Sequence, residues 1–122
     1  MRRLEILNET HPLSEPLRVD YCDSFLDRLK GLMFRTELSE HEGIVLVETS
    51  ESRLNSSIHM FFMKFDIATI WVNTKGIVVD IKLARKWRPY YSPAAPARFT
   101  IEARTEYLSL FKIGDQLAFH DV

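Results

Sequence analysis

The chain has 122 residues, of which 46 % are hydrophobic, and its formal net charge is −1. A chain of this size can bury one core without metal or disulfide cross-links, and its single cysteine, Cys22, excludes an intrachain disulfide and favours a reducing compartment. The sequence contains no run of about 18 apolar residues of the kind that spans a membrane. Glu5 interrupts the first apolar residues too early for a secretory signal. We therefore expect one cytoplasmic domain over residues 1–122, with no membrane partner.

The first half of the chain predicts a strand, a short helix and a second strand. Apolar and polar residues alternate over 17–22, which is typical of a half-buried strand. Ser24, followed by Asp27, forms a variant of the helix capping box and predicts a helix over about 24–33. Ser39 and Glu42 ahead of Gly43 favour one further helical turn, and the apolar run 43–47 predicts a buried strand.

The second half predicts mainly strands. The expected strands lie at 58–62, 67–72, 77–83, around 99–101 and at 117–119. Turns are expected at 73–76 and at Gly114-Asp115, and a short helix near 105–111. Residues 85–98 contain three prolines, which favour a long ordered loop.

These elements predict a mainly β, β-rich α+β fold. We expect a single small antiparallel barrel-like domain with one or two short helices, because closure would remove the edges of a sheet this rich in aliphatic residues. The neighbouring Met and Phe side chains are expected to fill the barrel, with the lining of a hydrophobic ligand cavity as the alternative; they are Met33, Phe34, Met60, Phe61, Phe62 and Met63.

Three segments together resemble the DUF192 family, also called UPF0127. They are Gly31-Leu32-Met33-Phe34-Arg35, residues 58–64 and residues 71–80, and the resemblance covers about 16–120. It implies a β-rich domain and no particular reaction. Glu102 and Gly114-Asp115 match the closing elements of the family, whereas Ala68 stands where members usually carry an aspartate and leaves Asp66 as the nearest acid.

The charges are unevenly distributed along the chain. Residues 1–51 hold six Lys or Arg against eleven Asp or Glu, whereas residues 82–104 hold six against one. The leading hypothesis is a non-enzymatic binding or accessory module for an anionic, partly planar ligand: a nucleotide, single-stranded nucleic acid or an acidic partner. Its predicted ligand-binding residues are Arg35, His59, Arg85, Lys86, Trp87, Arg88 and Tyr90.

Two other hypotheses remain open at this stage. One is a small enzyme that pairs His59 with Asp66 or Glu102 beside Arg35. The other is a structural module that binds partner proteins through the proline-rich loop. We expect no cofactor and no metal, because the four histidines are scattered. A helix N-terminus would lower the pKa of the Cys22 thiol.

Overall fold

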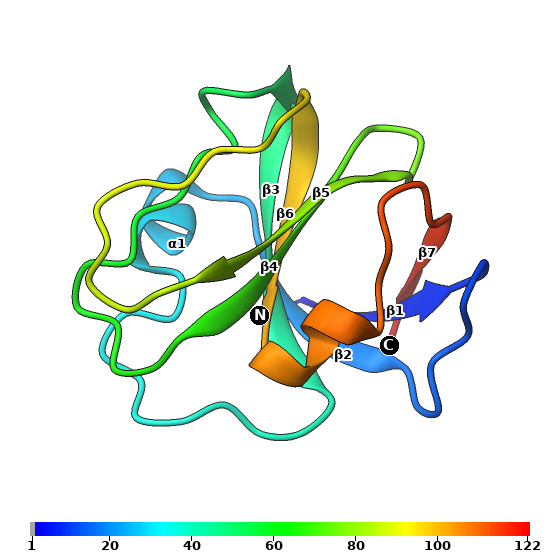
Figure 1. Ribbon diagram of the computed structural model, residues 1–122, viewed down its shortest axis with the longest axis horizontal. Helices are drawn as coiled ribbons and strands as arrows, with labels where there is room; N and C mark the ends of the chain where they lie inside the picture. The colour runs from blue at the N-terminus through cyan, green and yellow to red at the C-terminus, as the bar shows by residue number, and fades with distance from the viewer. Residues whose placement is uncertain (1) are drawn as a thin grey trace.

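The computed structural model describes residues 2–122 as one seven-stranded sheet with two short helices (Figure 1). The strand order across the sheet is β5-β4-β6-β3-β2-β1-β7. The elements are β1 (Arg3–Asn8), β2 (Leu17–Cys22), α1 (Phe25–Lys30), β3 (Glu42–Ser52), β4 (Ile67–Val72), β5 (Val78–Ala84), β6 (Ala97–Ala103), the 3₁₀ helix η1 (Thr105–Ser109) and β7 (Leu117–Asp121).

The sheet curls without closing. Its edge strands β5 and β7 meet only at one end, where Ile77 bridges Gln116 and the Leu117 N–H donates to the Gly76 carbonyl at 2.8 Å. All strand pairs are antiparallel except β2 with β3, which run parallel. The mainly β prediction is confirmed, with two differences: closure is incomplete and one pair is parallel.

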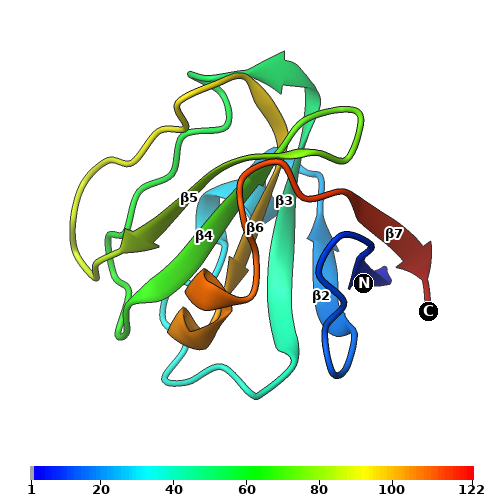
Figure 2. The ribbon, with the colours of Figure 1, turned by 45° about the vertical axis from the view of Figure 1, so that its right-hand side comes forward.

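Buried apolar side chains lie on both faces of the sheet. One cluster fills the inside of the curl, under η1, and includes Ile6, Val45, Ile70 and Ile101. The second lies on the opposite face and includes Ile44, Met60, Met63 and Trp71. In both views the segment 53–66 and the segment 85–96 run beside one another over this second face, on the same side as α1 (Figures 1 and 2).

The predicted helix over 24–33 is confirmed but shorter. Ser24 Oγ accepts from the Asp27 N–H at 3.1 Å, as the capping pattern predicts, and Gly31 ends the helix at φ +46°. None of the six residues of α1 is buried. The helix therefore lies over the sheet without inserting a side chain fully into the core. Neither helix of residues 2–122 is long and apolar enough to cross a membrane.

Two predicted elements are wrong and one strand was not predicted. Residues 58–62 form no strand: Ile58 makes a single bridge to Tyr91, and Phe62 has a positive φ of 62°, which breaks an extended chain. Residues 39–42 form a turn rather than a helical turn, because His41 also has a positive φ. The unpredicted strand is β1, which pairs with β2 and β7.

Candidate functional site

The predicted site residues fall in two separate places on the second face of the sheet. One is an exposed surface formed by residues around Phe34, Phe62 and Trp87. The other is a pocket beneath α1 that contains His59 and Glu102. We call the first the aromatic ridge, defined by Phe34, Phe62 and Trp87.

The aromatic ridge is a row of three exposed rings. The rings of Phe34 and Phe62 stack with centroids 5.1 Å apart, and Trp87 lies tilted against Phe62, also at 5.1 Å. The three residues are 59 %, 46 % and 55 % exposed. The expectation that Phe34, Phe61 and Phe62 fill the core is wrong, because all three are exposed while their neighbours Met60 and Met63 are buried.

Backbone geometry presents these rings. Phe34, Phe62 and Trp87 have φ values of +68°, +62° and +69°, a region that bulky residues rarely adopt and that costs of order 1 kcal/mol or more for each. Hydrogen bonds between the three segments hold this geometry: the Phe34 N–H donates to the Phe62 carbonyl at 3.1 Å, and the Trp87 N–H donates to the Met60 carbonyl at 2.8 Å. The ridge is thus an ordered feature of the backbone.

Cations flank the aromatic ridge. Arg85, Lys86 and Arg88 are exposed, and within residues 2–122 none of their side chains forms an ion pair. Arg35 follows Phe34 in the chain and lies 3.6 Å from Asp20. Unpaired guanidinium and ammonium groups beside exposed rings can bind an anion that also carries a flat group.

Two further predicted residues, Tyr90 and Asp66, make contacts that hold the loop 85–98 in place. The Tyr90 hydroxyl lies 3.0 Å from Ser57 Oγ, and the side chain is exposed. Asp66 Oδ1 accepts from the Lys86 N–H at 2.8 Å, so this carboxylate holds the start of the loop. Asp66 does not line the pocket.

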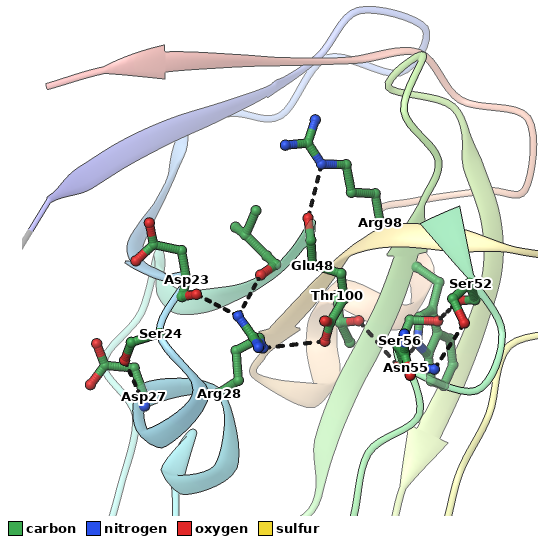
Figure 3. Close-up of polar contacts among 12 residues, drawn as sticks. Asp23, Ser24, Asp27, Arg28, Glu48, Ser52, Asn55, Ser56, Arg98 and Thr100 are labelled. Carbon is green, nitrogen blue, oxygen red and sulfur yellow. Dashed lines mark hydrogen bonds and ion pairs between the residues drawn. The ribbon is translucent and has the colours of Figure 1, made fainter. Parts of the chain in front are cut away.

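The pocket has a volume of about 430 Å³ and lies between α1, β3 and the segment 55–63. Arg28 lines the pocket and reaches from α1 toward β3 (Figure 3). Its guanidinium donates to the carbonyls of Asp23 and Val47 and lies 3.4 Å from Glu48 Oε1. The charge of Arg28 is therefore already balanced within the protein.

Glu102 lies in the wall of this pocket with no hydrogen-bond partner for its carboxyl group within residues 2–122. The residue is only 4 % exposed, and burial raises its pKa to about 8. Oε1 lies beside Gly31, so close that a methyl group in place of the glycine hydrogen would be 3.5 Å from it. An acid that is neutral near pH 7 can donate or accept a hydrogen bond, and it ionises readily when a cation approaches.

His59 lines the same pocket but is held by backbone groups. Its Nε2 lies 3.1 Å from the Leu29 carbonyl, and its Nδ1 lies 3.2 Å from the Phe61 N–H. This pattern fits an Nε2–H tautomer that joins α1 to the segment 58–62. Both ring nitrogens are engaged, and neither contacts Asp66 or Glu102 in a hydrogen bond.

The prediction for Cys22 is wrong in direction. Burial, together with the neighbouring carboxylates of Asp27, Asp20 and Glu102, raises the pKa of its thiol to about 12. The helix α1 has only six residues, none of them buried, and its N-terminus does not offset this rise in the pKa of the thiol. Within residues 2–122, no group of three His, Cys, Asp or Glu side chains is placed to hold a metal ion.

Sequence comparison places this chain among uncharacterised prokaryotic relatives. The profile of the family DUF192, described as Uncharacterized ACR, matches residues 6–119. A UPF0127 protein of Thermococcus gammatolerans is 42 % identical over 97 residues, which cover 80 % of this chain and 61 % of the relative. A UPF0127 protein of Pyrococcus furiosus is 33 % identical over 118 residues, covering 94 % and 97 %. The aligned part thus spans about three fifths of the Thermococcus relative.

Two solved structures share the fold. A Sinorhizobium meliloti protein, described as a candidate transcription regulator, superposes with a TM-score of 0.82 at 15 % identity and covers 97 % of this chain and 92 % of its own. A protein of unknown function from Novosphingobium aromaticivorans superposes with a TM-score of 0.77 at 20 % identity, covering 95 % and 83 %. At these identities the likeness concerns the fold alone.

Proposed function

This chain belongs to the DUF192 family, and from the geometry of its exposed face we propose that it is a non-enzymatic domain that binds single-stranded nucleic acid on the aromatic ridge. The observation that carries the proposal is the row of three exposed rings, each at a positive φ, beside unpaired cations. A nucleotide strand offers the two matching groups, flat bases and phosphates.

The exposure of the rings supports a binding role. Burial of apolar surface is the main force that stabilises a fold, so three large half-exposed rings in contact contribute less to stability than buried rings would. The positive φ values add backbone strain at the same three residues. Strained and exposed aromatic residues that are nevertheless ordered are typical of binding surfaces.

The charge distribution supports an anionic partner. Arg85, Lys86 and Arg88 surround Trp87 in the chain, and Arg35 follows Phe34. The unpaired cations Arg85, Lys86 and Arg88 can contact successive phosphates, while the free faces of Trp87 and Phe34 accept stacked bases. A single strand suits this surface better than a duplex, because stacking needs unpaired bases.

The contacts of His59 and Asp66 support a binding function over the enzyme hypothesis. Each of these side chains is hydrogen-bonded to a backbone group, and the two are not hydrogen-bonded to each other. A general base needs a free lone pair directed at its substrate. The pair His59 and Glu102 has the same difficulty, although both residues line one pocket.

Fluorescence anisotropy with a labelled oligothymidylate of about 12 nucleotides tests the proposal. Trp87→Ala should weaken binding by about 1–3 kcal/mol, the usual contribution of one stacked base. Replacing Arg85, Lys86 and Arg88 together by Ala should weaken binding. It should also reduce the slope of log affinity against log salt concentration by about 2, because each lost phosphate contact contributes about 0.7 to that slope.

A matched control removes three exposed cations elsewhere. Arg18, Lys75 and Lys112 are exposed and lie outside the ridge, so their combined replacement by Ala changes net charge equally but should leave the affinity within about twofold. Equal losses in both triple variants would mean that only net charge matters and would overturn the proposed site. Binding of an acidic peptide, with none of the oligonucleotide, would assign the ridge to a protein partner and refute the nucleic-acid proposal.

A further inference from the structure

The pocket beneath α1 contains an ionisable group, Glu102, that lies outside the aromatic ridge. Glu102 lies in β6, paired with Ile44 of β3 on one side and Thr69 of β4 on the other. These three residues share the face of the sheet that α1 covers. The carboxyl group of Glu102 is directed into the pocket from this face.

The polar groups around Glu102 leave it without a counter-charge. Thr69 Oγ1 is buried and also has no hydrogen-bond partner within residues 2–122. Arg28 is balanced by Glu48, and Lys30 is exposed at the end of α1. Thr69 Oγ1 is thus buried without a partner, whereas buried polar groups are usually satisfied, and the neighbouring Glu102 carboxyl faces the pocket.

About half of the residues that line the pocket are apolar. Its walls include side chains from α1 and the following turn, from β3 and from the segment 55–63: Leu29, Leu32, Met33, Leu46, Ile58 and Met63. A pocket of about 430 Å³ is within the range that accommodates a small ligand. The combination of these apolar side chains with one buried acid, Glu102, suits a molecule with an apolar body and a polar end.

We propose that this pocket binds a small ligand that carries a cationic nitrogen on an apolar body, with the nitrogen hydrogen-bonded to the Glu102 carboxylate. An ammonium or amidinium group supplies both the counter-charge and the hydrogen-bond donors that Glu102 lacks. The apolar body displaces water from the Leu and Met side chains. This site is separate from the aromatic ridge and does not depend on the function proposed for it.

Binding of a cation in this pocket is coupled to the release of a proton. The Glu102 carboxyl is neutral in the empty pocket near pH 7, so binding of a cation must release one proton to solvent. The titratable groups that face it are His59 from the segment 55–63, Lys30 and the Arg28–Glu48 pair at the rim, and the Cys22 thiol from β2. Both ring nitrogens of His59 contact backbone groups, and the released proton is assigned to Glu102.

Three probes of similar size that share a phenyl ring test the charge requirement: benzylammonium, benzyl alcohol and benzoate. Binding is followed by amide chemical shifts, with Gly31 as the reporter because it lies against Glu102 Oε1. Benzylammonium should bind at least tenfold more tightly than the alcohol, and benzoate should not bind. The affinity for benzylammonium should rise by up to tenfold per pH unit from about pH 6 to about pH 8, because ionisation of the Glu102 carboxyl is linked to binding.

Glu102→Gln should lower the affinity for benzylammonium at least tenfold and abolish the pH dependence, while Glu37→Gln, an exposed control with the same charge change, should alter neither. Equal binding of the amine and the alcohol, or an affinity that does not change with pH, would overturn the proposal. These wild-type measurements decide the question even if Glu102→Gln fails to fold, and oligonucleotide binding reports separately on the ridge.

Discussion

Replacing Glu102 by glutamine should change how the stability of this protein depends on pH. Glutamine has nearly the same shape as a neutral glutamic acid but cannot ionise. In the folded protein burial raises the pKa of Glu102 to about 8, against an ordinary value of 4.5. Between these two values the folded state holds a proton that the unfolded chain has lost, so the free energy of unfolding falls as the pH rises.

The size of the effect follows from the difference in pKa. Each pH unit between 4.5 and about 8 lowers the free energy of unfolding by about 1.4 kcal/mol, or about 5 kcal/mol over the whole range. The contribution of the neutral carboxyl is fully present below about 4.5 and is lost by about pH 8. A loss of this size is a large fraction of the 5–15 kcal/mol that stabilises a typical domain.

Urea unfolding at a series of pH values measures this effect, with the fluorescence of the buried Trp71 as the signal. Near pH 4 the wild type and Glu102→Gln should have similar stability, and above about pH 8 the variant should be more stable by several kcal/mol. The exposed control Glu37→Gln should give a curve parallel to the wild type. A constant difference between Glu102→Gln and wild type at every pH would show that Glu102 ionises normally and would refute the reasoning.

Three further outcomes follow from other buried groups. Asp115→Asn should lower the free energy of unfolding by about 1–3 kcal/mol at neutral pH, because the Asp115 carboxylate accepts hydrogen bonds from Asn8 Nδ2 at 2.8 Å and from the Lys112 N–H. Burial acts to raise the pKa of this carboxyl, but the hydrogen bonds outweigh it and the pKa is lowered. In urea titrations at acid pH the difference from wild type should therefore shrink as the carboxylate is protonated. Gly43→Ala should destabilise the fold by roughly 2 kcal/mol or more and lower the melting temperature, because the new methyl group would lie 2.4 Å from the Glu102 carbonyl oxygen; an unchanged melting temperature would contradict this close packing. Cys22 should react slowly with a thiol reagent at neutral pH and quickly only after unfolding, because burial raises its pKa to about 12; rapid labelling of the folded protein would contradict that assignment.

Local patterns in the sequence predicted several elements because their causes are local. The alternation over 17–22 became β2, since period-2 residues point to opposite faces of any sheet. Ser24 and Asp27 predicted the start of α1, because a capping hydrogen bond joins residues three apart. The turn at 73–76 was predicted from Gly76, which has the expected positive φ of 80°.

Tertiary structure decided the features that depend on distant partners. Residues 58–62 have strand-like composition, yet only Ile58 forms a β-bridge, to Tyr91 outside any strand. The positive φ of Phe62 accompanies the stacking of its exposed ring on Phe34. The parallel pairing of β2 with β3 has no signature in the alternation of either strand, because alternation predicts which face a residue takes and not the direction of its neighbour.

The candidate sites show the same division. Composition and charge alone marked Arg85 to Tyr90 as a basic aromatic segment, because residues adjacent in a loop stay adjacent in space. The stacking of Phe34, Phe62 and Trp87, and the burial of Glu102 without a counter-charge, arise from segments that lie far apart in the sequence. Only packing removes water from a carboxyl group, and desolvation is what separates Glu102 from an ordinary surface glutamate.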